Sequence, residues 1–196
     1  VSEIFFKETS DEEIVQFKKT HGLEKPFLLF VGKRGGYKNF DTFINAYAKW
    51  ENIDVEVALV GGGSFTKDEK KYLEKLKIHT RVRYLGSLTD DDLRRAYYAS
   101  TAFVFPTRYE GFGMPLLEAF ACGTRVIASD IPVFHELAGD TPIYASPDSE
   151  ESIIDGLNKI LSSDSLEEKE YRRVTAHTYR WENTVRKTLE VYQKLV

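Results

Sequence analysis

The sequence predicts an α/β fold, namely a Rossmann-like, doubly wound parallel sheet. Two observations carry this prediction. Short apolar runs alternate with segments of helical periodicity along the chain, an order typical of βαβ units. The apolar runs are also nearly continuous, which favours strands that are buried on both faces, as in parallel sheets. In this architecture ligands bind beyond the carboxyl ends of the strands.

The expected strands are the apolar runs themselves. They lie at 27–31, 55–60, 82–85, 102–105, 125–128 and, as a weaker run, 142–144. Three of their carboxyl ends, after Val31, Leu85 and Phe105, are followed by the segments in which we expect the chemistry.

The expected helices lie between and after these strands, at 11–20, 39–50, 66–77, 90–99, 115–121, 132–137, 149–161, 165–177 and 181–195. The segment from Lys67 to Lys77 interleaves five lysines with acids, which indicates a solvated helix face. Thr89, with an acid three residues later, has the signature of a helix cap. The last helix carries an apolar stripe at spacings of four, four and three: Trp181, Val185, Leu189 and Tyr192.

The composition is that of one globular domain. The chain has 196 residues, 42% of them hydrophobic and 13% aromatic, and a net charge of −4 that provides no electrostatic footprint for nucleic acid. The single cysteine, Cys122, excludes an internal disulfide, fits a reducing compartment and is expected to be a buried structural thiol. No apolar run approaches the ~20 residues that span a bilayer, and no signal-peptide pattern is present. We therefore expect a cytoplasmic protein.

The most informative segment is 104–123, which carries Glu110 and Glu118 on either side of a Gly-Phe-Gly-Met-Pro turn. The preceding strand is expected to run through this turn into a helix, with Pro115 at the first helical position. A helix start of this kind offers free backbone N–H groups and the positive end of the helix dipole to a phosphate. One carboxylate would lie just outside the helix and the other about one turn inside, an arrangement that suits a sugar nucleotide.

This segment resembles the signature of the group 1 glycosyltransferases, the large retaining family with the GT-B fold. The likeness covers nearly the whole chain, because further segments also occur in the order and spacing of the family. They begin at Phe30, Leu59, Val82, Val126 and Tyr179. The resemblance implies one half of a GT-B architecture, the C-terminal half that binds the donor.

The resemblance also implies a division of the chain. Residues 1–15 would be an interdomain lead-in, whose Ile4, Phe5 and Phe6 we expect to be exposed. Residues 16–178 would form the nucleotide-sugar domain. Residues 179–196 would form a helix that returns towards an N-terminal domain, and that domain would bind the acceptor.

Individual roles follow from the resemblance. Glu110 would face the donor sugar, and Glu118 would accept hydrogen bonds from the ribose hydroxyls. Arg34 and Lys38, after the first strand, would hold the diphosphate, the arginine bidentately and the lysine as a point charge. The sequence departs from the commoner pattern at Lys33, which stands where the family more often has the arginine. The remaining donor contacts would be backbone groups near the base, at Leu88, and at the helix start, at Gly113, Met114, Pro115 and Leu116.

Two further motifs have alternative interpretations. Gly61-Gly62-Gly63 lacks the G-x-G-x-x-G spacing of a dinucleotide site, which favours a plain strand-to-helix turn near the donor. Asp90-Asp91-Asp92 contains an Asp-x-Asp that could hold a divalent metal, but its place at the head of a helix favours capping. The four histidines show no zinc-ligand spacing, and the family generally works without metal, so we expect neither a metal nor a cofactor.

The sequence therefore predicts a metal-independent hexosyltransferase domain that binds a nucleotide-diphospho-sugar. Tyr37-Lys38-Asn39 looks like the version in bacterial mannosyl- or rhamnosyltransferases of surface-polysaccharide assembly, so a GDP-mannose-like donor is favoured. Alone, the domain is expected to be inactive, since the site for a sugar or lipid-linked sugar acceptor would lie on the other domain, which could contact a membrane. A non-catalytic nucleotide-sugar binding or scaffold module stays open as an alternative. A nicotinamide-dependent Rossmann enzyme is disfavoured by the missing fingerprint.

Overall fold

A computed structural model describes residues 1–194 of the chain. Its centre is a six-stranded parallel sheet of order β3-β2-β1-β4-β5-β6, which confirms the predicted doubly wound fold. The strands are β1 (Phe27–Val31), β2 (Glu56–Val60), β3 (Val82–Gly86), β4 (Ala102–Phe105), β5 (Val126–Ser129) and β6 (Ile143–Ala145).

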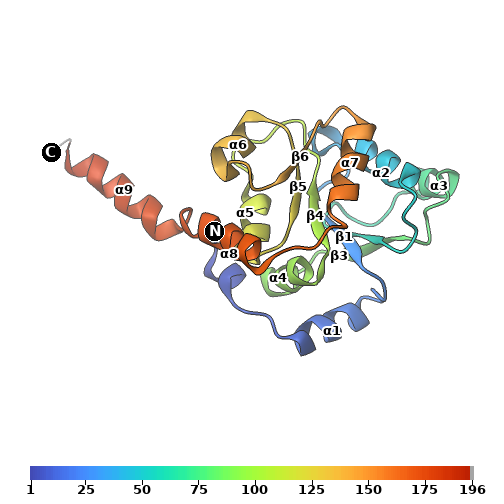
Figure 1. The fold of residues 1–196 in the computed structure, drawn as a ribbon, viewed down its shortest axis with the longest axis horizontal. Coiled ribbons are helices and arrows are strands. Elements are labelled where there is room, and N and C mark those ends of the chain that lie inside the picture. The colour runs from blue at the N-terminus through green and yellow to red at the C-terminus, as the bar shows by residue number, and fades with distance from the viewer. Residues whose placement is uncertain (195–196) are drawn as a thin grey trace.

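Helices cover both faces of the sheet (Figure 1). One core cluster lies between the sheet and α1 (Asp11–Thr20), α4 (Asp90–Ala99), α5 (Met114–Ala121), α6 (Pro132–Ala138) and α8 (Leu166–His177). The other lies between the sheet and α2 (Phe40–Lys49), α3 (Lys67–Lys75) and α7 (Glu150–Lys159). Both faces of the sheet are therefore apolar, which explains why the strand sequences are continuous apolar runs.

The strand order reverses between β1 and β4. The chain moves outwards from β1 through β2 to β3 and then returns to pair β4 with the free side of β1, where Leu28 lies opposite Ala102 and Leu29 opposite Phe103. The connections that leave β1 and β4 at their carboxyl ends then run to helices on opposite faces of the sheet, α2 and α5. Such a reversal opens a crevice at the edge of the sheet.

The predicted strands and helices are all present, and their described ends lie within two residues of the prediction. Leu195, the last residue of the predicted last helix, and Val196, the last residue of the predicted last segment, lie outside the described residues. The predicted segment boundary at residue 15 falls within α1, and the division into a lead-in and a donor domain stays a prediction.

The first residues differ from the expectation. Residues Glu3–Phe6 form a short 3-10 helix, η1, that packs on α4 and α5, and Phe5 is only 2% exposed. Its ring meets that of Tyr97 edge to face. Ile4 and Phe6 are partly buried against the same core. The prediction that these three side chains are exposed is wrong, because they pack against α4 and α5. Nothing in the sequence indicated this contact.

The start of α5 requires a glycine. Gly113, the residue before the helix, has φ 104°, and a Cβ on it would lie 2.8 Å from Cε1 of Phe134. The helix begins at Met114, so Pro115 occupies its second position and not the predicted first. With φ in the left-handed region, the chain turns sharply from β4 into α5 while α6 packs directly against the turn.

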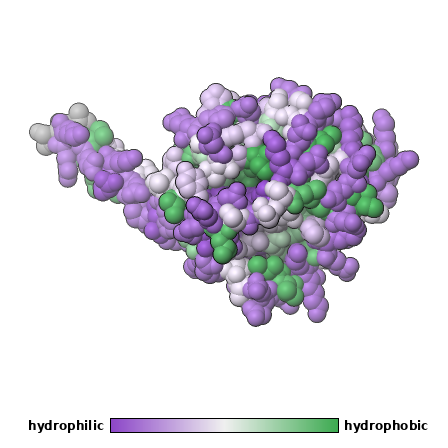
Figure 2. Space-filling model, in the orientation of Figure 1, coloured by the Kyte–Doolittle hydropathy of each residue, from purple (hydrophilic) through white to green (hydrophobic). Residues whose placement is uncertain are grey.

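The last helix, α9 (Trp181–Gln193), projects away from the body of the molecule (Figure 1). No residue of it is buried. Its predicted apolar stripe is present, and the four side chains are each more than half exposed: Trp181, Val185, Leu189 and Tyr192. Figure 2 shows many hydrophilic residues on the face turned to the reader, with separate hydrophobic patches on the body and a few hydrophobic residues along α9.

Gly113→Ala is expected to destabilise the fold by more than the cost of a left-handed residue alone. Both Gly113→Ala and the control Gly63→Ala place a side chain at positive φ, which costs roughly 1–2 kcal/mol. Only Gly113→Ala also pushes a Cβ into Phe134, since nothing lies within 4 Å of a Cβ on Gly63. Denaturant unfolding of both variants tests this, and an equal loss of stability in the two would contradict it.

Candidate functional site

The loops after β1 and β4 lie side by side at the reversal of strand order, and several hydrogen bonds hold them together. The Asn39 side chain donates to Pro106 O after β4 (2.9 Å) and also to Pro147 O after β6 (2.6 Å). The Arg108 amide donates to Tyr37 O (2.8 Å). Asn39 has φ 57° and is 3% exposed, so a small polar residue that tolerates the left-handed region is needed at this position. These bonds fix the distance between the two loops.

The two loops bring Lys38 and Glu110 into direct contact, an ion pair that the sequence did not predict. Lys38 Nζ lies 2.6 Å from Glu110 Oε1, and the two side chains are 16% and 12% exposed. The ammonium also lies over two rings, 4.9 Å from the centroid of Phe105 and 5.4 Å from that of Tyr37. A cation and an anion are thus held, largely out of water, at the edge of the sheet where this fold binds ligands.

The start of α5 adds hydrogen-bond donors to this edge. No side chain caps the helix, and Pro115 has no N–H. The Leu116 amide, one of the predicted phosphate donors, donates to Gly113 O at 3.0 Å. The amides of Gly113 and Met114 have no hydrogen-bond partner within residues 1–194. These two N–H groups and the helix dipole favour an anion beside Glu110.

Glu118 lies in α5, about one turn after its start, as predicted. Its Oε2 accepts a hydrogen bond from the Tyr97 hydroxyl at 3.3 Å. Burial raises the pKa of Glu118 above its usual range, while the bond from Tyr97 acts in the opposite direction. The structure therefore presents a half-buried carboxylate with spare acceptor capacity, which suits the hydroxyls of a sugar or ribose.

Within residues 1–194, Arg34 forms no ion pair or hydrogen bond with Lys38 or Glu110. Its guanidinium contacts Glu69 on α3 and the carbonyls of the turn after β2. Arg34 is 6% exposed. The structure thus brings together Lys38, Glu110 and the start of α5, whereas the contact between Arg34 and a diphosphate stays a prediction.

The interpretations of Thr89 and Cys122 agree with the structure, whereas the role of Leu88 and the independence from metal stay predictions. Thr89 caps α4, where its hydroxyl accepts from the Asp92 amide at 3.2 Å. Cys122 is 1% exposed, and burial raises the pKa of its thiol. Leu88, expected near the base, is partly buried against the core. Residues 1–194 contain no group of three or more His, Cys, Asp or Glu side chains arranged to hold a metal ion.

Three residues that position the site were not recognised in the sequence. Asn39 ties the two loops together, Tyr97 holds Glu118, and Glu69 holds Arg34. Only Asn39 had a local signal, because an asparagine directly before a helical pattern marks a turn. Tyr97 and Glu69 are distant in sequence from their partners, so no spacing could identify them.

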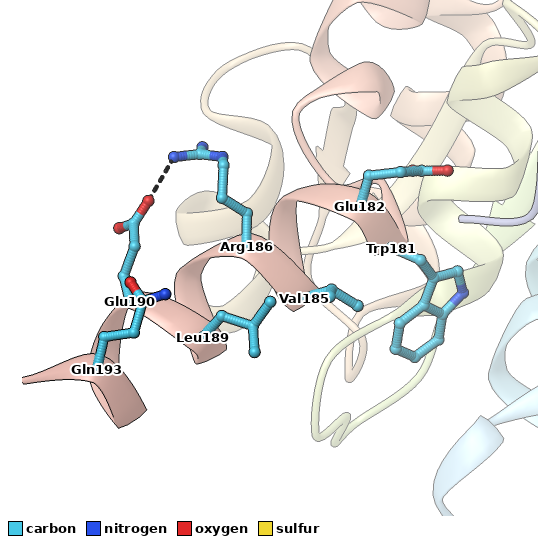
Figure 3. A pocket seen from close by; sticks show the side chains of 7 residues that line it. All are labelled: Trp181, Glu182, Val185, Arg186, Leu189, Glu190 and Gln193. Atoms are coloured by element: carbon cyan, nitrogen blue, oxygen red, sulfur yellow. Dashed lines mark hydrogen bonds and ion pairs between the residues drawn. The ribbon is translucent and has the colours of Figure 1, made fainter. Parts of the chain in front are cut away.

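An open hollow lies along α9 (Figure 3). Trp181, Val185 and Leu189 point to one side of the helix, and Glu182, Arg186 and Glu190 to the other. Arg186 and Glu190 form an ion pair at 2.9 Å on the polar side. The hollow is an open apolar face of one helix and contains no converging polar groups, unlike a small-molecule site.

Known proteins are similar to this chain in sequence and in fold. A family model described as Glycosyl transferases group 1 matches residues 11–181. The chain is 37% identical over 116 residues to O-antigen chain mannosyltransferase B of Escherichia coli, which covers 58% of this chain and 30% of the relative. It is 29% identical over 149 residues to O-antigen chain mannosyltransferase RfbU of Salmonella typhimurium, which covers 76% and 41%. The chain spans less than half the length of these curated relatives.

Solved structures share the fold. A glycosyltransferase from Rickettsia africae superposes with a TM-score of 0.86 at 20% identity, over 97% of this chain and 54% of that one. Anabaena Alr3699/HepE, solved in complex with UDP and glucose, superposes with a TM-score of 0.81 at 19% identity, over 99% and 54%. The chain thus matches one Rossmann-like half of GT-B structures. Within residues 1–194 no helix has both the length and the apolar character to cross a bilayer.

Glu118→Gln is expected to become more stable relative to the parent as pH rises. Because burial raises the pKa of Glu118, the folded parent loses stability when the pH passes from the unfolded pKa through the raised one, whereas a neutral amide does not. Thermal unfolding between about pH 4 and pH 8 measures this difference. Glu74→Gln, an exposed change on α3, controls for the lost charge. If the stability of the parent instead increased relative to that of Glu118→Gln as the pH rises, the argument from burial would be disproved.

Proposed function

The chain belongs to the group 1 glycosyl transferases, and we propose that it is the part of such an enzyme that binds a nucleotide-diphospho-sugar. The observation that carries the proposal is the contact between Lys38 and Glu110 beside the unpaired amides at the start of α5. A diphosphate needs a cation and N–H donors, and a sugar needs a hydroxyl acceptor next to them. All three lie at the reversal of strand order, the place where this fold takes nucleotides.

On binding, the donor would break the ion pair between Lys38 and Glu110 and bind to both side chains. Lys38 would turn its ammonium to the diphosphate, and the Gly113 and Met114 amides would bind the same oxygens. Glu110, released from the lysine, would accept hydrogen bonds from the sugar hydroxyls. Glu118, further along α5, would accept those of the ribose.

We propose a retaining transfer with attack on the front face. The acceptor hydroxyl oxygen bonds to the anomeric carbon while the bond from that carbon to the phosphate oxygen breaks, and its electron pair stays on the diphosphate. The proton of the acceptor hydroxyl passes to the departing phosphate oxygen. Positive charge on the sugar and negative charge on the diphosphate both grow in this step. Preorganised groups such as Lys38 and the α5 amides are each worth roughly 3 kcal/mol when aimed at such charge.

The donor we favour is GDP-mannose or a related nucleotide sugar, used without a bound metal. Support comes from the two relatives, which are named O-antigen chain mannosyltransferases. The product would be a hexosyl unit added to a sugar or to a lipid-linked sugar in surface polysaccharide or glycolipid synthesis. The proposed donor and product rest on the names of these relatives and on the resemblance of the loop after β1 to that of bacterial mannosyl- or rhamnosyltransferases.

The acceptor would be bound by a second domain. The solved GT-B structures are about twice as long as the part that this chain matches. The exposed apolar stripe of α9 offers a surface for such a domain, because a helix with one apolar face is normally packed against a partner (Figure 3). We therefore expect the isolated chain to bind the donor but not to transfer the sugar.

The chain is expected to bind one nucleoside diphosphate selectively, and GDP most tightly. Calorimetric titration with GDP, UDP, ADP and dTDP, first without metal and then with Mg²⁺, measures this. Lys38→Ala should weaken binding by roughly tenfold or more, since it removes the cation that faces the diphosphate. Lys49→Ala is the matched control, because it also breaks a lysine–glutamate pair, with Glu150 at 2.6 Å, but outside the site. Equal affinities for Lys38→Ala and the parent would reject the assignment.

Glu110→Ala is expected to slow transfer strongly while nucleotide affinity is kept or increased. The carboxylate competes with the diphosphate for Lys38, so its removal frees the ammonium. Transfer, measured in a chain that also carries the acceptor domain, should fall by roughly 100-fold or more because the sugar is no longer oriented. A variant that loses nucleotide affinity and keeps transfer would show that Glu110 acts only as a partner of the lysine.

A further inference from the structure

We propose that Arg34 does not bind the donor but holds the turn 61–64 in place, with Glu69 completing the clamp. The proposal rests on the proposed donor site, because the function of the clamp would be to position Lys38 for the diphosphate. It assigns a role to Glu69 that no sequence motif indicated. Arg34 and Glu69 would be positioning residues and would not touch the substrate.

The guanidinium of Arg34 already has partners within the protein. Its Nε donates to Glu69 Oε1 at 2.6 Å, and its Nη1 donates to Gly61 O at 3.3 Å. Its Nη2 lies within hydrogen-bond distance of Gly63 O (2.9 Å), Ser64 O (3.2 Å) and Glu69 Oε2 (3.3 Å). Since a guanidinium has five N–H groups, little capacity is left for a phosphate.

The side chain is also confined sterically. Its guanidinium carbon lies 5.0 Å from the ring centroid of Phe65 and 5.5 Å from that of Tyr84. To reach a diphosphate beside Lys38, the buried guanidinium would have to leave two rings, three carbonyls and a carboxylate. Each of these contacts is already charge-assisted or stacked, so the exchange is unfavourable.

The turn that Arg34 holds has a conformation that depends on such support. Gly61, Gly62 and Gly63 all have φ in the left-handed region, at 81°, 73° and 79°. Two of their carbonyls, together with that of Ser64, converge on the one guanidinium. Carbonyl oxygens brought together in this way repel one another unless a cation lies between them. Without Arg34 the turn would lose the charge that stabilises it.

The turn 61–64 also supports the side chain of Lys38. A Cβ on Gly62 would lie 2.9 Å from Gly32 O, so the turn lies directly against the loop after β1. A Cβ on Gly32 would lie 3.7 Å from Lys38 Cε, so the stem of the lysine runs over Gly32. A continuous set of contacts therefore leads from Arg34 through the turn and Gly32 to the cation that faces the donor.

Glu69 connects the clamp to α3. Its carboxylate accepts from the Thr66 amide at 2.7 Å while the Thr66 hydroxyl accepts from the Glu69 amide at 3.1 Å, which makes a capping box. The hydrogen bond from Arg34 lowers the pKa of Glu69, with a further contribution from the Thr66 amide. One carboxylate thus fixes both the guanidinium and the start of the helix. Glutamine can keep the capping box but cannot supply the charge.

The effect of Glu69→Gln on nucleotide affinity distinguishes two alternative roles of Arg34, because the two roles predict changes of opposite sign. If Arg34 binds the diphosphate, removing its competing carboxylate should leave nucleotide affinity unchanged or increase it. If Arg34 is a clamp, the same change should weaken nucleotide binding, although it removes a negative charge from the neighbourhood of an anion site.

The experiment compares the parent, Arg34→Gln, Glu69→Gln and the double variant by titration with GDP and UDP and by hydrogen exchange of the amides of residues 61–66. We expect both single variants to bind roughly tenfold more weakly, the scale of one charge-assisted hydrogen bond. The double variant should bind no more weakly than either single one, because both changes remove the same clamp. Exchange in the turn should become faster in all three variants.

Arg83→Gln is the matched control. Arg83 holds Glu56 with two hydrogen bonds, at 3.0 and 3.3 Å, between the starts of β2 and β3, whereas the turn 61–64 follows the carboxyl end of β2. It should change neither the nucleotide affinity nor the exchange of the turn. A thermal unfolding transition for each variant verifies that it folds, and if Arg34→Gln does not fold, the sign of the Glu69→Gln effect still decides.

Two results would overturn the proposal: Glu69→Gln binding as tightly as the parent or more tightly, or unchanged exchange of the turn in both single variants. A parent that binds neither nucleotide would reject the proposed donor site instead. In that case the exchange measurement alone decides whether Arg34 and Glu69 hold the turn.

Discussion

The pairing of β4 with β1 is the constraint on which the rest of the site depends. Because β4 adds to the free side of β1 after the chain has left through β2 and β3, the loops after β1 and β4 meet at one edge of the sheet. Asn39 and the Arg108 amide then join these loops by hydrogen bonds to backbone carbonyls. Lys38 and Glu110, 72 positions apart in the sequence, come into contact as a result.

The site combines groups that do not favour folding by themselves. A lysine and a glutamate are removed from water, a second carboxyl is half-buried beside a tyrosine, and a helix begins without a side-chain cap. A buried ion pair contributes little net stability, because desolvation offsets the attraction. The fold tolerates these groups because two apolar clusters, one on each face of the sheet, hold the strands that carry them. Polar groups of this kind at one edge of a well-packed sheet are typical of a ligand site.

Arg34 shows where a local motif is insufficient. In the sequence it lies four residues before Lys38, in a glycine-rich loop, and by residue type both cations suit a diphosphate. In the structure the lysine meets Glu110, whereas the arginine is surrounded by Glu69 and the carbonyls of another loop. Since the partners of a long side chain are set by elements that are distant in sequence, the residue type alone does not determine its role.

By itself, the sequence determined the sheet, its helices and the strand ends after which the candidate site residues lie. Apolar runs and helix caps are local signals, so the strands at 27–31 and 102–105 and the cap at Thr89 agree with the prediction. Only the tertiary structure decided which side chains meet. Phe5 is buried, Glu118 is held by Tyr97 and Arg34 by Glu69, because packing and hydrogen bonding join residues whose separation along the chain leaves no pattern in the sequence.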